Sequence, residues 1–209
     1  AIYIARQTGA HVTGITITPE QVVEANKNAR IAEVTSLTSF KLMDYTKTSF
    51  PKGAFDVVFA IESACYAYPK SILLNEFYRI LRPGGVLVIN DGYVKRSPKN
   101  PLEIKLLRSA CEGWYVREFV DYRDMTKSMR QSGFKEILIK DQTLVVRPTL
   151  RFIDSLVRRF RPLFWLSRHL PGNFVQSISD NVMSLATLSE GDKAGLFGYY
   201  SHVARKPRK

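Results

Sequence analysis

A carboxylate, Glu62, directly follows the apolar run Phe55 to Ile61, which is typical of a strand buried on both faces. In open α/β sheets, ligands bind beyond the carboxyl ends of such strands, so we expect Glu62 at a binding edge. A carboxylate there can stabilise a carbocation and remove a proton from it, and the ring faces of Tyr66 and Tyr68 can line the same cation. Glu62 is therefore the candidate catalytic residue and the tyrosines are candidate substrate contacts. Alternatively, Glu62 caps a helix or pairs with a base such as Lys70.

Two more polar side chains follow a second predicted strand. Pro83-Gly84-Gly85 is expected to end a helix and to turn the chain into a strand over Val86 to Asn90. Asp91 and Tyr93 come just after that strand, so both are expected at the same sheet edge as Glu62 and are candidate substrate contacts. The alternative is that they only shape the loop.

Short apolar strands alternate with helical stretches through the first two thirds of the chain. This alternation predicts an α/β fold with a mostly parallel sheet that is covered on both faces. The predicted strands are His11 to Thr18, Thr38 to Met43, Phe55 to Ile61, Val86 to Asn90, Lys135 to Lys140 and Gly198 to Ala204. The predicted helices are residues 2–5, 19–32, 71–81 and 117–132. Thr18 is expected to cap the second helix, because Pro19 suits the first helical position.

An insertion over residues 147–192 separates the last two predicted strands and divides the core into residues 1–146 and 193–209. Its first helix places four apolar residues on one face: Ile153, Leu156, Val157 and Phe160. This helix is expected to end at Pro162, and another is predicted from about Asn173 to Leu188. The insertion is expected to be a lid, with Phe164 and Trp165 as candidate substrate contacts.

The 209 residues carry a formal net charge of +12, a balance that attracts anionic surfaces or nucleic acid. Six arginines lie in or beside the insertion: Arg147, Arg151, Arg158, Arg159, Arg161 and Arg168. With the apolar residues 164–166 they suggest peripheral contact with an anionic membrane, and the alternative is a lid with solvated arginines. No nucleic-acid partner is expected, because the aromatic residues do not alternate with arginines.

Several other classes of protein do not fit the sequence. No apolar run approaches the roughly 18 residues of a membrane span, and Cys65 and Cys111 form no CxxC pair. These features suit a reducing compartment, so the expected location is cytoplasmic, with the membrane contact noted above. His11, His169 and His202 lack metal-ligand spacing, so no metal site is expected.

Four stretches occur in a specific order along the chain: GAHVTGITITPEQ from Gly9, FDVVFAIESACYAYP from Phe55, EFYRILRPGGVLVINDGY from Glu76 and QSGFKEILIKDQT from Gln131. Together they resemble the class I S-adenosylmethionine (SAM)-dependent methyltransferase family, in its sterol C-methyltransferase-like and tocopherol methyltransferase-like branch. The resemblance covers about residues 1–146 and 194–207. It implies a Rossmann-like sheet whose first strand and glycine-rich cofactor turn lie upstream of Ala1.

The resemblance implies SAM as methyl donor and S-adenosylhomocysteine as product. Thr16, with Ile17 and Gln21 beyond it, is expected to bind the ribose where most nucleotide-binding sheets place a carboxylate. Asp44 matches the acid that accepts from the adenine amino group, with the Tyr45 backbone beside it. Alternatively, Thr16 is an ordinary strand residue and Asp44 a turn-forming one.

The expected function is methyl transfer to a hydrophobic small molecule, such as an isoprenoid, a sterol-like compound or a lipidic quinone precursor. Glu62 and its loop favour C-methylation, although Tyr66 stands where the family's sterol enzymes usually have His. O- or N-methylation of a polyketide or an alkaloid is the second possibility. A third is a non-catalytic binding module with a methyltransferase fold. A nicotinamide dehydrogenase is disfavoured.

Overall fold

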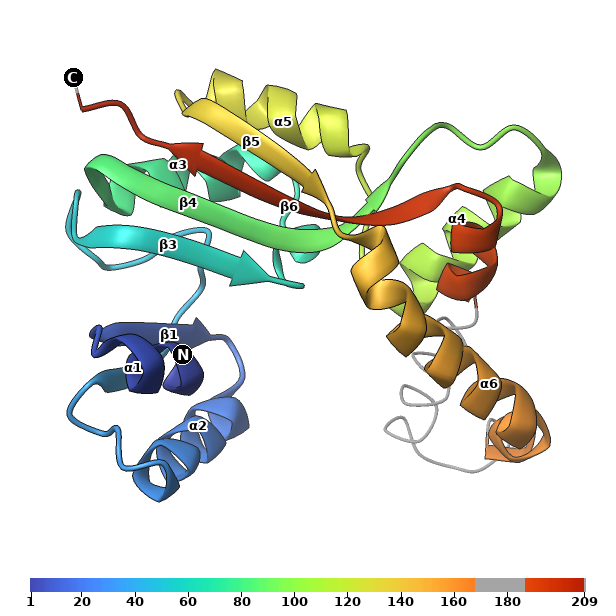
Figure 1. The fold of residues 1–209 in the computed structure, drawn as a ribbon, viewed down its shortest axis with the longest axis horizontal. Coiled ribbons are helices and arrows are strands. Elements are labelled where there is room, and N and C mark those ends of the chain that lie inside the picture. Colours follow the sequence, from blue (N-terminus) through green and yellow to red (C-terminus); the bar gives the residue numbers. More distant parts are fainter. Residues whose placement is uncertain (168–186, 209) are drawn as a thin grey trace. The chain divides into compact units, whose positions relative to one another are not determined.

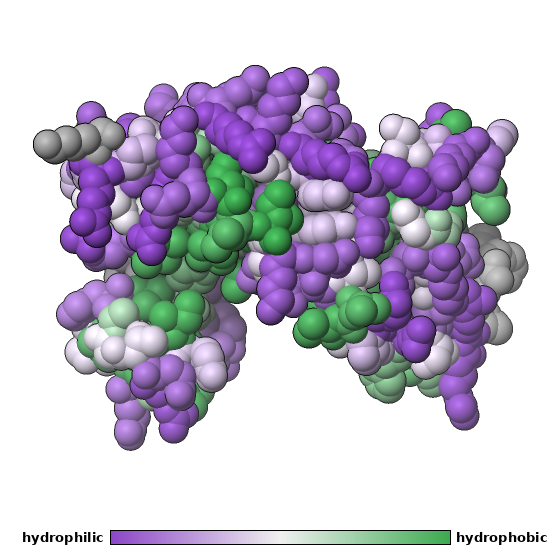
Figure 2. Space-filling view, turned by 45° about the horizontal axis from the view of Figure 1, so that its top comes forward, coloured by the Kyte–Doolittle hydropathy of each residue, from purple (hydrophilic) through white to green (hydrophobic). Residues whose placement is uncertain are grey.

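A computed structural model describes residues 1–167 and 187–208 of the chain (Figure 1). The chain divides into two compact units, Ala1–Pro51 and Lys52–Lys209. No helix among the described residues is long and apolar enough to cross a membrane. The space-filling view shows hydrophilic residues over much of one face, with hydrophobic residues gathered in separate areas (Figure 2).

The first unit is a two-stranded parallel sheet with two helices: α1 (Ile2–Thr8), β1 (Val12–Thr16), α2 (Pro19–Ile31) and β2 (Thr38–Leu42). α1 ends at Gly9, whose φ of 71° lets its N–H bond the Ala5 carbonyl. Thr18 is the N-cap residue of α2 as predicted, but its side chain makes no capping hydrogen bond. The main-chain carbonyl of Thr18 accepts the Gln21 N–H instead, at 3.1 Å, and so supplies the partner that a capping hydroxyl would provide.

The second unit is built on a four-stranded mixed sheet with strand order β3-β4-β6-β5. Its strands are β3 (Phe55–Ile61), β4 (Leu81–Val94), β5 (Lys135–Asp141) and β6 (Phe197–Arg205). β3 and β4 are parallel, whereas β6 is antiparallel to both β4 and β5. The α/β fold is confirmed, and the parallel pairing holds for β1–β2 and β3–β4.

Helices of the second unit pack on the sheet and extend from one end of it (Figure 1). They are η1 (Ala64–Tyr66), α3 (Lys70–Ile80), α4 (Pro101–Gly113), α5 (Tyr122–Gln131) and α6 (Thr143–Ser167), and residues 187–193 are also helical. Sequence analysis missed α4, although Asn100 caps it and Pro101 begins it. α5 starts five residues later than predicted, because the Asp121 carboxylate caps the Arg123 N–H.

The turn Pro83-Gly84-Gly85 lies inside β4, so the prediction that it precedes the strand is wrong. α3 ends earlier, at Ile80. Gly84 has a φ of 78°, and a Cβ on Gly85 would lie 2.8 Å from the Arg82 carbonyl oxygen. The chain therefore passes close to its neighbours and continues into a longer strand.

The core of the second unit lies between the sheet and the helices α3 and α5. Its fully buried side chains include Leu73, Leu87, Ile89, Met125 and Met129. β3 is not buried on both faces as predicted: Val57 and Ile61 are 49% and 55% exposed. The described helices of this unit cover the face that carries Val58 and Ala60, which are buried.

α6 runs through Pro162, so the predicted helix end there is wrong. A proline removes one main-chain donor, but the flanking residues of this helix keep their helical backbone. Of the predicted apolar face, Val157 is buried, whereas Leu156 and Phe160 are exposed. The side chains of Phe164 and Trp165, and the predicted helix up to residue 186, lie outside the described residues.

Candidate functional site

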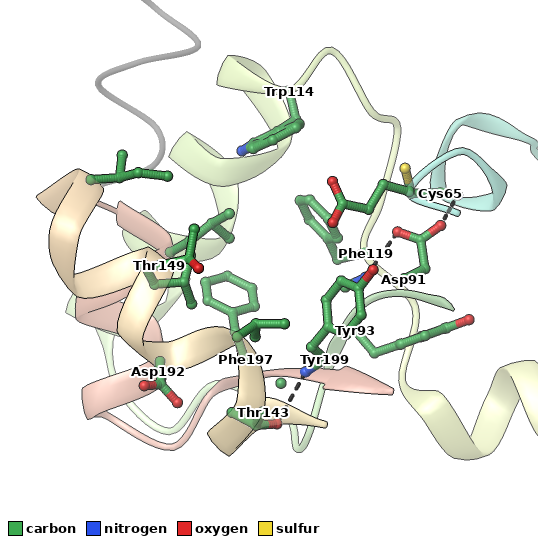
Figure 3. A pocket seen from close by; sticks show the side chains of 17 residues that line it. Cys65, Asp91, Tyr93, Trp114, Phe119, Thr143, Thr149, Asp192, Phe197 and Tyr199 are labelled. Atoms are coloured by element: carbon green, nitrogen blue, oxygen red, sulfur yellow. Dashed lines mark hydrogen bonds between the residues drawn. The ribbon is translucent and has the colours of Figure 1, made fainter. Parts of the chain in front are cut away.

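A cavity of about 540 Å³ lies in the second unit, where β3 and β4 end and β6 begins (Figure 3). The antiparallel register places Gly92 opposite Tyr199 and Val94 opposite Phe197. The end of one strand therefore meets the start of the other at a single edge. That edge is also where the chain leaves β3 toward Glu62.

Apolar and aromatic side chains form most of the cavity wall. The aliphatic wall consists of Val146, Leu150, Ile153 and Leu188, and the aromatic wall of Tyr93, Trp114, Phe119, Phe197 and Tyr199. Three carboxylates complete it: Glu62, Asp91 and Asp192. Among the described residues that line the cavity there is no Lys, Arg or His, although the chain as a whole carries a charge of +12. The cavity therefore suits a hydrophobic molecule, and its aromatic wall together with the Glu62 carboxylate suits a positive centre.

Glu62 lies on the cavity wall as predicted. Its φ of 49° is uncommon for a residue other than glycine, and its N–H donates to the Asn90 carbonyl at 2.8 Å. Tyr199 lines the same cavity, and burial followed by the Glu62 charge raises the pKa of its phenol. The alternative in which Glu62 pairs with Lys70 is not observed, since the Lys70 ammonium donates to main-chain carbonyls.

Lys70 is buried beneath the loop that follows Glu62. Its ammonium donates to the carbonyls of Ala64, Cys65 and Ala67 at 3.0, 2.7 and 2.7 Å. Burial lowers the pKa of this amine. The three bonds satisfy carbonyls of η1 and so fix the course of the loop.

Asp91 and Tyr93 are part of β4, which corrects the prediction that they follow the strand. Both line the cavity and are almost fully buried. The Asp91 carboxylate accepts the N–H groups of Cys65 and Gly92 at 2.9 and 2.8 Å (Figure 3). The Asp91 carboxylate therefore holds the loop that follows Glu62 against β4, in addition to the bonds from Lys70.

Burial is the largest influence on the pKa values of Asp91 and Cys65. It raises the pKa of Asp91 to about 6, although the bonds from Gly92 and Cys65 favour the carboxylate. Burial and the neighbouring Asp91 charge raise the pKa of the Cys65 thiol to about 12. Cys65 is thus a neutral thiol near neutral pH, which does not favour nucleophilic chemistry.

The raised pKa of Asp91 predicts a pH dependence of stability. Between about pH 4 and 6 the folded protein holds a proton on Asp91 that the unfolded chain has released, so stability falls as pH rises through this window. Relative to Asp91→Asn, which cannot titrate, the wild type is expected to lose up to roughly 3 kcal/mol between pH 4 and 7. Urea unfolding of both proteins across that range measures the difference, and a difference that stays constant with pH would contradict the prediction.

Aromatic residues from three segments close the cavity. Trp114 caps the C-terminal end of α4, Phe119 lies in the following loop, and Phe197 begins β6 (Figure 3). The Trp114 indole N–H is buried and has no hydrogen-bond partner among the described residues. It is therefore available to a polar atom of a ligand.

Tyr66 and Tyr68 do not line this cavity. Their side chains are 48% and 44% exposed, and the Arg117 guanidinium lies 4.0 Å from the centre of the Tyr68 ring. Their role as substrate contacts stays a prediction.

The predicted cofactor residues meet in the first unit, at the carboxyl edge of β1 and β2. Thr16 pairs with Leu42 in register, and the main-chain carbonyl of Thr16 accepts the Met43 N–H at 2.8 Å. The Thr16 hydroxyl donates to the Gln21 side-chain carbonyl, which leaves the Gln21 amide N–H groups for a ligand. Ile17 is 73% exposed beside them.

Asp44 forms a turn, which is one of the two roles that the sequence left open. Its Oδ1 accepts the main-chain N–H and the hydroxyl of Thr46, both at 2.7 Å, so it does form a turn. Its Oδ2 has no partner among the described residues and can accept from an amino group. Tyr45 follows in the same turn. This set of exposed polar groups fits the ribose and adenine of a nucleoside.

Some residues of the cavity wall lie far from Glu62 in the sequence, and these were not predicted. Tyr199 and Phe197 reach it through the β4–β6 register, and Trp114 reaches it through the C-terminal end of α4. The Asn100-Pro101 start signal could have revealed α4. No local pattern marks Tyr199.

Comparisons with known proteins agree with this architecture. Residues 1–89 match the family model described as Methyltransferase domain. Sterol methyltransferase-like 3 of Botryococcus braunii is 29% identical over 220 residues, which cover 99% of this chain and 56% of that protein. The 2-methyl-6-phytyl-1,4-hydroquinone methyltransferase of Synechocystis sp. is 28% identical over 209 residues, covering 97% of this chain and 64% of that protein.

A solved structure has the same fold. Geranyl diphosphate C-methyltransferase from Streptomyces coelicolor A3(2), in complex with Mg²⁺, geranyl diphosphate and S-adenosyl-L-homocysteine, superposes with a TM-score of 0.72 at 20% identity. The superposition covers 98% of this chain and 67% of that chain. The chain spans between 56% and 64% of the length of the two curated relatives named above.

Proposed function

We propose that this chain is a class I SAM-dependent methyltransferase, as the family match over residues 1–89 and the curated relatives support, and that it transfers a methyl group from SAM to a carbon atom of a hydrophobic small molecule. The observation that carries this proposal is the cavity, whose aromatic and aliphatic wall includes Glu62. The printed names of the relatives support an isoprenoid, sterol or prenylated quinol acceptor.

The proposed reaction joins the methyl carbon to an acceptor carbon. SAM, when bound, would supply the methyl group by displacement: the π electrons of the acceptor would form the new carbon–carbon bond as the carbon–sulfur bond breaks, and the electron pair of that bond would stay on the sulfur of S-adenosylhomocysteine. A carbon–carbon double bond that takes the methyl group becomes a carbocation. The Glu62 carboxylate stabilises this charge and then removes a proton from the adjacent carbon, which restores a neutral double bond.

The cavity wall contributes in two further ways. The aromatic rings of Trp114 and Phe119 present π faces that stabilise a cation. The apolar wall also excludes water, which would otherwise add to the cation and give an alcohol. Both effects depend on a closed cavity, and α6 supplies one side of it through Val146, Leu150 and Ile153.

Residues 147–192 are proposed to cap this cavity as a lid. The described part of that range supports the proposal, because Leu150, Ile153, Leu188 and Asp192 line the cavity. Membrane contact has weaker support. Several α6 residues are exposed and apolar: Leu144, Val145 and Phe152. However, Arg147 and Arg158 form ion pairs with Asp192 and Asp154, so their charge is partly neutralised.

The cofactor placement is tested by binding. Thr16→Ala and Asp44→Ala are each expected to weaken binding of S-adenosylhomocysteine by about 1–3 kcal/mol, because each leaves a polar group of the ligand without its partner. Isothermal titration calorimetry of each variant measures the change. Thr38→Ala is the control, since Thr38 lies at the opposite end of the same sheet, where its hydroxyl donates to the Val34 carbonyl. Unchanged affinity in both test variants would rule out this placement.

A further inference from the structure

A second, smaller pocket of about 230 Å³ adjoins the cavity in the second unit. We call it the basic pocket, and its described wall consists of Arg147, Leu150, Arg151, Ser189, Asp192 and Lys193. Leu150 and Asp192 line the larger cavity as well. The two spaces therefore lie side by side at these two residues.

Two helices build the basic pocket, and each contributes residues that are three and four positions apart. Residues with this spacing share one face of a helix. α6 contributes Arg147, Leu150 and Arg151, and the helix over residues 187–193 contributes Ser189, Asp192 and Lys193. The pocket is therefore a groove between two helix faces, built without any part of the sheet.

The guanidinium of Arg147 is already oriented by the protein. Its Nε and Nη2 donate to the Asp192 carboxylate at 2.7 and 2.9 Å, a paired geometry that fixes the plane of the group. A guanidinium has more N–H donors than these two bonds use. The remaining donors are available to a ligand in the pocket.

The charges around the basic pocket do not cancel. The Asp154 carboxylate is shared by Lys193 and Arg158, at 3.3 and 2.9 Å, and Arg158 lies 3.3 Å from Glu190. Arg151 is exposed and forms no ion pair with the described residues. Its positive charge therefore has no counterpart in the described part of this cluster.

We propose that the basic pocket binds the phosphate head of the acceptor while the hydrophobic part of the acceptor fills the cavity. This inference rests on the proposed function, because it names the class of acceptor: an isoprenoid with a phosphate or diphosphate head. Guanidinium groups donate pairs of parallel hydrogen bonds to phosphate oxygens. A phosphate would also compensate the charge of Arg151.

The two ends of the combined site suit opposite charges. Asp192, at the edge of the basic pocket, lies across the cavity from Cys65 and Asp91 (Figure 3). Cys65 belongs to the loop that follows Glu62. The head would thus bind at the end away from the Glu62 carboxylate, which avoids repulsion between like charges. The reacting carbons would lie toward Glu62, where the positive charge develops.

A matched pair of ligands tests the inference: geranyl diphosphate and geraniol differ only in the head. Each is titrated into the full-length protein with S-adenosylhomocysteine bound, and calorimetry gives both affinities. Wild type is expected to bind geranyl diphosphate at least about 10-fold more tightly than geraniol. Arg151→Gln is expected to weaken binding of geranyl diphosphate by about 5- to 20-fold, because one charge-assisted contact is lost, and to leave geraniol within about twofold.

Arg159→Gln is the matched control. Arg159 is also an exposed arginine of α6, and it does not line the basic pocket. Its replacement is expected to leave both affinities within about twofold of wild type. Lys193→Gln provides a second test at the other helix, in case Arg151→Gln fails to fold, and is expected to weaken geranyl diphosphate binding selectively. Equal affinity of wild type for the two ligands, or unchanged affinities in both variants, would overturn the inference.

Two further ligands separate other sources of phosphate. Inorganic pyrophosphate that binds as tightly as geranyl diphosphate would indicate a site for free anions and overturn the inference. Sedimentation with phosphatidylglycerol vesicles tests a lipid head group. Vesicle binding that Arg151→Gln abolishes, without tight binding of geranyl diphosphate, would assign the pocket to a membrane lipid and also overturn the inference.

Methyl-labelled SAM distinguishes this inference from the function on which it rests. If label enters geraniol as fast as geranyl diphosphate and Arg151→Gln changes neither rate, methyl transfer stands and the inference is overturned. If Arg151→Gln selectively weakens binding of geranyl diphosphate but wild type transfers no label to any acceptor, the phosphate site stands and the proposed methyl transfer falls.

Discussion

Replacing Glu62 with glutamine is expected to lower kcat by about 10²- to 10⁴-fold, the usual contribution of a positioned general base. Glutamine keeps the shape of the side chain, but it carries no charge and cannot take a proton. The affinity for S-adenosylhomocysteine is expected to change by less than about twofold, because the carboxylate acts on the acceptor. Single-turnover kinetics and calorimetric titration measure the two quantities separately.

Glu136 provides the control for this substitution. It shares the φ of 49° with Glu62, and its carboxylate forms an ion pair with Arg205 at 3.2 Å. It lies in β5, away from the cavity wall. Glu136→Gln is expected to leave turnover unchanged. Equal losses of turnover and cofactor affinity in Glu62→Gln would point to a structural role for Glu62 and contradict the account.

Lys70→Met is expected to lower the free energy of unfolding by about 3 kcal/mol, because three main-chain carbonyls lose their charged donor inside the protein. Methionine fills a similar volume, so the effect reports the hydrogen bonds and not a cavity. The loop from Glu62 to Ala67 also loses its anchor on the helix side, so turnover is expected to fall together with stability. Urea unfolding and steady-state kinetics check both expectations.

Lys127→Met is the matched control, because Lys127 is an exposed lysine of α5. Its replacement is expected to change stability by less than about 0.5 kcal/mol, as is usual at the surface. A Lys70→Met protein as stable as wild type would show that water replaces the ammonium at these carbonyls. The loop would then not depend on Lys70.

Local sequence signals predicted the strands of the sheet well. β3 was found with its observed bounds, because every residue from Phe55 to Ile61 except Asp56 is apolar. The polar residues at strand ends were also placed correctly at sheet edges, as Glu62 and Asp44 show. Parallel strands bring their carboxyl ends to one edge, so a pattern in the sequence suffices to group such residues.

Features that depend on distant contacts could not be predicted in the same way. β4 extends beyond its apolar run at both ends, and Gly85 allows a close approach to the main-chain oxygens of Arg82 and Asp56. Asp91 therefore lies inside the strand, where it is buried. Tyr199 lines the same cavity as Glu62 only because of the register of β6 on β4. Register is set by the whole sheet, so no single segment encodes it.

The net charge of the chain likewise did not predict which charges line the cavity. A net charge of +12 suggested an anionic partner, yet the cavity wall carries carboxylates and no basic side chain among its described residues. Arg147 is bound to Asp192 by two hydrogen bonds of 2.7 and 2.9 Å. Composition gives the total charge, whereas the fold decides which charges face a ligand.

Methyl-labelled SAM gives the sharpest test of the proposed methyl transfer to a hydrophobic acceptor. The full-length protein would be incubated with the labelled donor and, in turn, with a sterol, an isoprenoid diphosphate and a prenylated hydroquinone. The account predicts that label enters one of these acceptors at a new carbon–carbon bond and that the transfer is lost in Glu62→Gln. Tight binding of S-adenosylhomocysteine with no label in any acceptor would contradict it and would favour a non-catalytic module with a methyltransferase fold.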